Sequence, residues 1–224
     1  RFNTFVQGRL WFKNDKMQNT PDLAESLPDQ SNSKEAIIKI KENARWQDGT
    51  EITASDVLFS FQLYRDCDIR EYEYIANKLI VEQIDAKTIR IKPEEGVSSF
   101  WYYVNDGVAK LYILPKHLIG EMGMILPGDD FSKKPQGAGA FKIDNITKKG
   151  SQVIVDFIRH PYYYYDEYAT SEKIKEVTLV TEPIMAMIVQ GLKVDNESSY
   201  NNGKKAGLDL IVEELSSITN LEIL

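Results

Sequence analysis

The chain has 224 residues, enough to bury a sizeable core in one or two domains. Its hydrophobic fraction of 42% and charged fraction of 27% are those of an ordinary globular protein and exclude disorder as its main state. The formal net charge is -7, and no basic cluster is long enough to follow a phosphate backbone. Nucleic-acid binding and electrostatic attachment to an anionic membrane are therefore not expected.

A single cysteine, Cys67, allows no internal disulfide and has no partner in a CxxC or zinc pattern. No apolar run reaches the ~18 residues that a membrane-spanning helix needs. The chain opens with Arg1 and not with Met, so we expect a processed or excised sequence. Any export signal or lipid-bearing cysteine would then lie upstream.

The first half of the chain alternates surface segments with two clear elements. Residues 21–26 are expected to lie on the surface, and residues 36–41, which alternate and are β-branched, predict a strand. After an Asp48-Gly49 turn, Thr53 is a good N-cap. Together with an acidic residue in the first turn, it predicts a helix from Ala54 to about Arg65.

The middle of the chain predicts a second helix over residues 71–79 and a strand pair, 81–84 and 88–92, joined by a turn at 85–87. Pro115 starts a short helical turn.

The second half is predicted to contain a loop and further strands. Residues 137–143 have no third glycine and no Gly-Lys-Ser/Thr, so they predict a tight backbone turn before a strand and not a phosphate loop. The other expected features are a loop at 122–136, a turn at 148–150, strands at 152–158, 175–180 and 208–212, a helix at 184–192 and an exposed loop at 193–205. Mixed α and β elements without an internal repeat result.

No residue constellation predicts catalysis or metal binding. The two histidines, His117 and His160, have no ligand at helix or hairpin spacing, and we expect them to be surface or capping residues. The paired carboxylates at 129–130 and 213–214 are adjacent in sequence, so their side chains do not point to one place. Acidic neighbours would raise the pKa of the Cys67 thiol. The sequence therefore predicts a protein that is not an enzyme and that holds no metal or cofactor.

Two runs of four consecutive aromatic residues, 100–103 and 162–165, are the most unusual local features. Four neighbours in sequence cannot all face one core, because a strand alternates sides and a helix spreads them around its axis. Each run marks either a boundary between core and surface, or a ligand cleft or interdomain face.

Residues 41–61, KENARWQDGTEITASDVLFSF, closely resemble a signature of the family 5 bacterial extracellular solute-binding proteins. That family includes the oligopeptide-, dipeptide- and nickel-binding receptors of ABC importers. Similar segments follow the family's order at residues 20–26, 113–118, 135–142, 155–165 and 207–210. The chain departs from the family pattern at Ala138 and Ala140, where Thr and Pro are usual, and residues 193–206 resemble an insertion.

The resemblance implies an α/β fold, the first lobe of a periplasmic-binding-protein-like architecture (type II, cluster C) with an inserted α+β subdomain. It assigns residues 1–32 and 136–224 to the core lobe and residues 33–135 to the insertion. The family's second lobe is expected to be absent from this chain, because members are about twice this length, as two lobes of ordinary domain size require.

The resemblance also implies function. The chain would be the substrate-binding component of an ABC-type importer, which captures oligopeptides or dipeptides outside the cell and delivers them to a membrane permease. It would be a monomer, either periplasmic or a cell-surface lipoprotein. A nickel chelate, sugar or opine ligand stays open, as does a different class of function, a stand-alone cell-surface protein-interaction module. By position in the motif order, one wall of the ligand cleft would be formed by Val6, Gln7, Arg9, Tyr72, Tyr74, Gly137, Ala138, Gly139 and Phe141.

Overall fold

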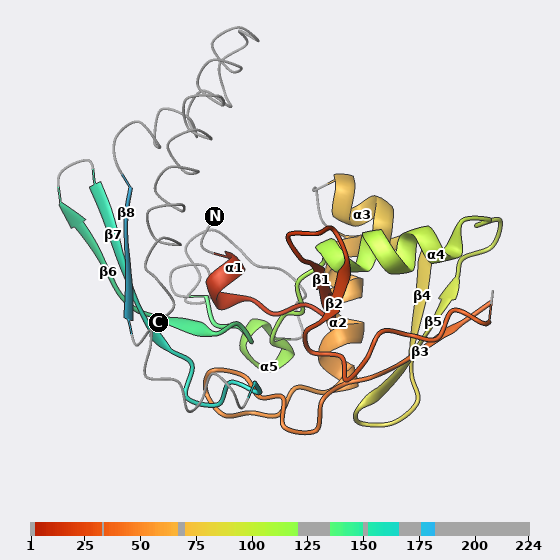
Figure 1. The fold of residues 1–224 in the computed structure, drawn as a ribbon, viewed down its shortest axis with the longest axis horizontal. Helices are drawn as coiled ribbons and strands as arrows, with labels where there is room; N and C mark the ends of the chain where they lie inside the picture. Colours follow the sequence, from red (N-terminus) through yellow and green to blue (C-terminus); the bar gives the residue numbers. More distant parts are fainter. Residues whose placement is uncertain are drawn as a thin grey trace, which may run out of the picture. The chain divides into compact units, whose positions relative to one another are not determined.

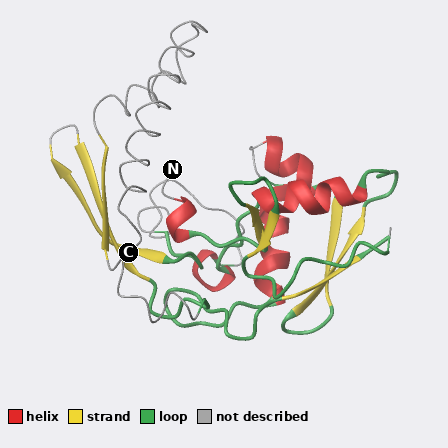
Figure 2. Cartoon of the chain, in the orientation of Figure 1, coloured by secondary structure: helices red, strands yellow, loops and turns green. Residues whose placement is uncertain are grey.

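The computed structural model describes residues 3–32, 34–66, 70–120, 135–149, 152–165 and 176–181. The chain divides into two compact units: residues 1–142 with 159–170, and residues 143–158 with 171–224. Figures 1 and 2 show the elements. The helices are α1 (Asn3–Val6), α2 (Ala54–Arg65), α3 (Arg70–Ala76), α4 (Phe100–Tyr102), the π-helix η1 (Tyr103–Gly107), the 3-10 helix η2 (Val108–Lys110) and α5 (Lys116–Ile119). The strands are β1 (Trp11–Lys13), β2 (Asn19–Pro21), β3 (Ala36–Lys39), β4 (Leu79–Gln83), β5 (Thr88–Pro93), β6 (Phe141–Lys149), β7 (Gln152–Arg159) and β8 (Glu176–Thr181).

The main sheet of the first unit is antiparallel, with the strand order β3-β5-β4. Ile38 lies opposite Ile89, and both side chains are buried, whereas Ile37 between the buried positions of β3 is exposed. The alternating pattern of residues that predicted β3 therefore arises because only one face of the sheet is buried. The predicted hairpin of β4 and β5 is confirmed.

Helix α2 has the predicted bounds and begins at a reciprocal cap. The backbone N–H of Thr53 donates to Oδ2 of Asp56 at 2.8 Å, which gives one of the helix-terminal donors an acceptor. The other carboxylate oxygen, Oδ1, accepts the backbone N–H of Lys116 at 3.1 Å and so ties the start of α5 to α2. In Figure 1, α2 and α3 lie beside the sheet, and both contact β4.

Two predicted boundaries are wrong. Helix α3 ends at Ala76 and not at residue 79, because Leu79 is fully buried and already pairs with Pro93 in the sheet. Residues 148 and 149, which were expected to belong to a turn, are the last residues of β6, which ends at Lys149. In both cases strand pairing, which local sequence does not encode, outweighs the local preference.

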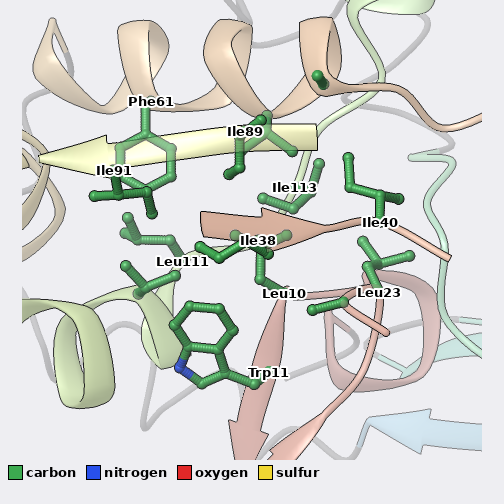
Figure 3. Packing of buried hydrophobic residues seen from close by; sticks show 14 of the residues in the cluster. Leu10, Trp11, Leu23, Ile38, Ile40, Phe61, Ile89, Ile91, Leu111 and Ile113 are labelled. Carbon is green, nitrogen blue, oxygen red and sulfur yellow. The ribbon is translucent and has the colours of Figure 1, made fainter. Parts of the chain in front are cut away.

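The core joins the N-terminal segment of the first unit to its sheet. Side chains of Leu10, Trp11 and Leu23 are fully buried with Ile38, Ile89 and Leu111, and Figure 3 shows them gathered around β3 and β5. The predicted insertion, residues 33–135, thus shares one core with the N-terminal segment. The division expected at residues 32 and 136 stays a prediction.

The segment at residues 21–26 is only partly on the surface, which corrects the prediction. Leu23 and Ala24 are fully buried, whereas Glu25 and Ser26 are exposed. Backbone pairing causes the difference: the N–H of Leu23 donates to the carbonyl of Arg9 at 2.8 Å, and that of Ala24 to the carbonyl of Leu10 at 3.1 Å.

The second unit contains a sheet of order β6-β7-β8, in which β7 and β8 are antiparallel. The predicted strands at 152–158 and 175–180 are confirmed within a residue of their bounds. Residues 121–134 and 182–224 lie outside the described part, and with them most of the 122–136 loop, the 184–192 helix, the 193–205 loop and the 208–212 strand. Across the described residues, no helix combines the length and apolarity that crossing a membrane requires.

Candidate functional site

Residues 6–9 (the 6–9 segment) lie between two distant parts of the chain. On one side, the N–H of Gly139 donates to the carbonyl of Val6 at 2.8 Å. On the other, the N–H of Ile113 donates to the carbonyl of Gly8 at 2.9 Å, and Arg9 forms an isolated antiparallel bridge with Tyr112. Two groups of predicted site residues, 6–9 and 137–139, are therefore brought together.

The turn at residues 137–139 (the 137–139 turn) is a close contact of backbones. A Cβ atom placed on Gly137 would lie 2.2 Å from the carbonyl oxygen of Val6, and one on Gly139 would lie 2.4 Å from that of Phe5. Only glycine fits at either position. This confirms the interpretation as a tight turn before a strand. Beyond it, Phe141 meets the Phe5 ring edge-on at 6.1 Å between centroids.

Gln47 holds this contact together, and sequence reasoning missed it. Its Nε2 donates to the carbonyl of Phe141 at 2.8 Å and to that of Val6 at 3.3 Å, from a side chain that is only 5% exposed. Gln7 makes a longer bond on the same side, from Nε2 to the carbonyl of Gln136 at 3.4 Å. In the signature at residues 41–61, Gln47 stands between Trp46 and the Asp48-Gly49 turn, at a position where the residue type varies. Its identity therefore did not mark it as a site residue.

Arg9 stands at the start of a row of tyrosines. Its guanidinium carbon lies 4.3 Å from the centroid of the Tyr112 ring, and its Nη2 donates to the Tyr112 hydroxyl at 2.7 Å. Tyr64 donates its hydroxyl to the carbonyl of Tyr112 at 2.9 Å, and its ring packs edge-on against Tyr72 at 5.2 Å. Three tyrosines thus form a continuous row of contacts, Tyr112, Tyr64 and Tyr72 (the tyrosine row). Through Tyr112 and Tyr64, this row connects two predicted site residues, Arg9 and Tyr72. The two other tyrosines of the row had no distinctive sequence context.

Tyr74 makes its contacts elsewhere. It is 55% exposed, and its hydroxyl lies 2.8 Å from that of Tyr103. Tyr72 and Tyr74 are two positions apart on α3, and side chains so spaced point to different sides of a helix. The side chains of the first aromatic run, residues 100–103, face different environments, as expected for four consecutive aromatic residues. Phe100 is buried in the core, whereas Tyr102 is 59% exposed.

The second aromatic run is anchored to a buried carboxylate that sequence reasoning did not single out. Asp22 accepts the hydroxyl of Tyr164 at Oδ1 and the backbone N–H of Arg9 at Oδ2, the latter at 2.7 Å. Lys41 donates to the Asp22 carbonyl, and its Nζ lies 4.1 Å from the centroid of the Tyr165 ring. Burial raises the pKa of Asp22 and, with the nearby Asp22 charge, that of Tyr164 well above its usual value.

We expect Tyr164→Phe to lower the free energy of unfolding by about 1–3 kcal/mol, because Oδ1 of Asp22 would stay buried without its donor. Urea unfolding of the chain would measure the change. Tyr162→Phe is the matched control, since that side chain is 48% exposed, and it should have almost no effect. Equal stability of the two variants would contradict this role of the hydroxyl.

The two histidines have different environments. His117 is a surface residue whose Nε2 lies 2.7 Å from Oδ2 of Asp48, and this ion-pair geometry lowers the Asp48 pKa against the opposing effect of burial. His160 is only 2% exposed, so it is no surface residue. Its Nδ1 accepts the N–H of Tyr162 at 2.9 Å, a capping contact, and its Nε2 lies 3.2 Å from the carbonyl of Arg45. Among the described residues, no three His, Cys, Asp or Glu side chains are grouped to hold a metal ion.

The predicted site residues differ in how much surface they offer a ligand. Val6, Gln7 and the 137–139 turn are buried, Arg9, Tyr72 and Phe141 are half-buried, and Tyr74 is exposed. The accessible groups are thus a guanidinium and aromatic faces, which can bind and orient a ligand. In the described part of this site, no nucleophile stands next to a base.

Known proteins give this arrangement a context. The model of the bacterial extracellular solute-binding proteins, family 5 Middle, matches residues 18–190. The oligopeptide-binding protein AppA of Bacillus subtilis (strain 168) is 29% identical over 245 aligned residues, which cover 92% of this chain and 44% of that protein.

Two solved structures have a similar fold. AppA from Clostridium difficile has a TM-score of 0.64 and 29% identity, over 90% of this chain and 39% of that one. AppA from Bacillus subtilis, solved in complex with a nonapeptide, has a TM-score of 0.64 and 25% identity, over 84% of this chain and 36% of that one. The chain thus spans less than half the length of these relatives and has the mixed α/β fold of periplasmic binding proteins.

The matched range includes the signature around the Asp48-Gly49 turn, the Asp22 junction and the 137–139 turn. The chain belongs to the bacterial extracellular solute-binding proteins of family 5.

Proposed function

We propose that the chain is the first lobe of the substrate-binding component of an ABC-type importer, which captures oligopeptides or dipeptides outside the cell and delivers them to a membrane permease. The ligand would lie between this lobe and a second one that closes over it. Closure would exclude water and so strengthen the polar contacts to the ligand.

The observation that carries this proposal is the likeness to AppA of Bacillus subtilis, an oligopeptide-binding protein, across 92% of the chain. The structure of AppA from Bacillus subtilis was solved in complex with a nonapeptide. Peptides suit a surface of backbone groups and aromatic faces, because such a surface pairs with the ligand's main chain and leaves its side chains loosely specified.

We assign two roles to the predicted binding residues. Arg9, Tyr72, Tyr74 and Phe141 have accessible surface and would contact the ligand. The buried residues Val6, Gln7, Gly137, Ala138 and Gly139 would fix the backbone that carries them. The role of the protein is then to bind without chemical change, in keeping with relatives that are binding proteins.

The proposed setting is extracellular or periplasmic, as the family description indicates. We propose a monomer, attached to the cell surface by a lipid where the organism has no periplasm. Mass spectrometry of the mature natural protein would detect such a lipid, and its absence from a cell-surface form would contradict the anchor.

We expect the complete natural protein to bind peptides with micromolar or tighter affinity and the 224-residue chain alone to bind them weakly or not at all. The chain by itself would offer half of the contacts, and affinity falls steeply when contacts are lost. Isothermal titration with mixed di- to hexapeptides measures both proteins. Micromolar binding by the chain alone would contradict the half-site, and a complete protein that co-purifies with a sugar, an opine or a nickel chelate would contradict the peptide ligand.

The exposed tyrosines support one alternative, a stand-alone cell-surface module that holds a protein partner. Tyr74 and Tyr102 are each more than half exposed, and Tyr103 contacts both rings. The length of the natural gene separates the two functions. A stop codon soon after Leu224 favours the module, whereas coding sequence for a further lobe favours the receptor.

A further inference from the structure

Among the residues that the structure describes, no carboxylate forms an ion pair with the guanidinium of Arg9. Arg45, Arg65 and Arg90 each pair with a glutamate at 3.0–3.1 Å, but none of the ion pairs among the described residues includes Arg9. The Nε atom of Arg9 is buried and has no acceptor among the described residues. The hydrogen bond from Nη2 to Tyr112 uses one of the five donors of the guanidinium, and within the described part of the chain the other donors remain available.

Asp22, which accepts a hydrogen bond from the main chain of Arg9, does not pair with its side chain. Both carboxylate oxygens of Asp22 already accept hydrogen bonds, one from the Tyr164 hydroxyl and one from the backbone of Arg9, not from its side chain. Burial raises the pKa of Asp22 against the opposing effects of its hydrogen bonds and of the nearby Lys41 and Arg9 charges. Asp22 therefore fixes the main chain at Arg9 and leaves the guanidinium available.

The guanidinium is also held in place. Stacking on the Tyr112 ring at 4.3 Å and the bond to its hydroxyl restrict rotation of the side chain. The hydrogen bond from the Tyr64 hydroxyl to the carbonyl of Tyr112 fixes the backbone that carries this ring. A planar cation that is fixed before binding loses less entropy when an anion pairs with it, and its fork of donors matches a carboxylate.

We propose that Arg9 binds a carboxylate of the ligand, and that the half-buried members of the tyrosine row, Tyr112 and Tyr72, form a surface for the adjacent ligand residue. This inference rests on the proposed peptide-binding function and adds a chemical preference to it. The carboxylate is either the C-terminus of a peptide or an acidic side chain. An anion would reach the guanidinium through the exposed part of the half-buried Arg9 side chain.

The test uses the complete natural protein and tri- to hexapeptides, each prepared as a free acid and as a C-terminal amide, with and without an internal glutamate. Titration calorimetry gives the affinity of each peptide for the wild type, Arg9→Gln and Arg9→Lys. Arg90→Gln is the matched control, because it removes an arginine whose ion pairs lie on the main sheet. Circular dichroism establishes that each variant is folded.

If Arg9 binds the C-terminus, amidation should weaken binding to the wild type about 10–100-fold, as expected for the loss of a charge-assisted hydrogen bond. If it binds an acidic side chain, loss of the internal glutamate should have that effect instead. In either case Arg9→Gln should remove the preference, Arg9→Lys should retain part of it, and Arg90→Gln should retain all of it. A folded Arg9→Gln protein with wild-type preference would overturn the assignment of Arg9 and leave the peptide function intact. A wild type that binds no peptide would overturn the proposed function and this inference with it.

Discussion

Gly139→Ala is expected to lower the free energy of unfolding by about 3 kcal/mol, at the upper end of what overpacking usually costs. The new methyl group would lie 2.4 Å from the carbonyl oxygen of Phe5 and 2.7 Å from the carbonyl carbon of Val6. Both atoms belong to the backbone, so no side-chain rotation relieves the clash. Moving the turn away would also break the hydrogen bond from Gly139 to Val6. Urea unfolding monitored by tryptophan fluorescence would measure the loss.

Gly96→Ala is the control for this experiment. Gly96 has a φ of +78° and no atom within 4 Å of an added Cβ, so alanine there meets backbone strain without a clash. The strain costs about 1–2 kcal/mol. If Gly139→Ala costs no more than Gly96→Ala, the 137–139 turn is not the close backbone contact described above. Gly137→Ala should resemble Gly139→Ala, because its Cβ would lie 2.2 Å from the Val6 carbonyl oxygen.

The second large effect is a loss of stability in mild acid caused by His160. Burial lowers the pKa of His160 from 6.5 to about 4, despite the carbonyl of Arg45 near its Nε2. Protonation of Nδ1 would also remove the acceptor of the Tyr162 N–H. In the folded protein the imidazole of His160 is therefore neutral, and we assign its proton to Nε2.

The sign of the pH dependence follows from proton binding. Between pH 6.5 and about 4 the unfolded chain binds a proton at His160 that the folded chain does not, so stability falls as the pH falls. The contribution is complete above the unfolded pKa and is lost as the pH approaches the folded one. The difference between the two pKa values corresponds to about 3 kcal/mol.

A variant pair isolates this contribution. We compare the parent with His160→Asn, both in a His117→Asn background, so that His160 is the only titrating imidazole. Asparagine can still accept the Tyr162 N–H but does not titrate. Asp22 acts in the opposite direction, because its raised pKa lowers stability as the pH rises above 3.8, but both proteins share it and it cancels in the difference. Urea unfolding between pH ~4 and ~7.5 should show a steep dependence for the parent and a flatter one for His160→Asn. Parallel curves would contradict the assignment to His160.

The sequence was most informative where a residue type has one local reason to be present. Thr53 and Asp56 predicted the start of α2 because capping depends on residues three positions apart. Asp48-Gly49 predicted a turn, and Gly49 has a φ of +91°. The alternation along β3 and β5 predicted strands with one buried face.

The sequence was less informative where distant segments meet. The surface interpretation of residues 21–26 was wrong because Leu23 and Ala24 pair with the main chain of residues 9–10. His160 was expected to be a surface or capping residue; it caps the Tyr162 N–H, but it is buried, and its Nε2 lies near the carbonyl of Arg45, 115 positions away in the sequence. Tyr72 and Tyr74 were grouped as one wall, and the helix separates them.

By itself, then, the sequence determined the family, the main helix, the strands of the main sheet and the glycine turn, because caps, turns and alternating strands are recorded within a few neighbouring residues. The tertiary structure alone decided that Gln47 joins residues 6 and 141, that Asp22 is buried against Tyr164, and that Arg9 lies on Tyr112 with no ion pair to any residue the structure describes. Buried polar and charged groups need partners, and in this fold the partners come from residues up to 142 positions apart in the sequence. Local sequence patterns do not record such pairings.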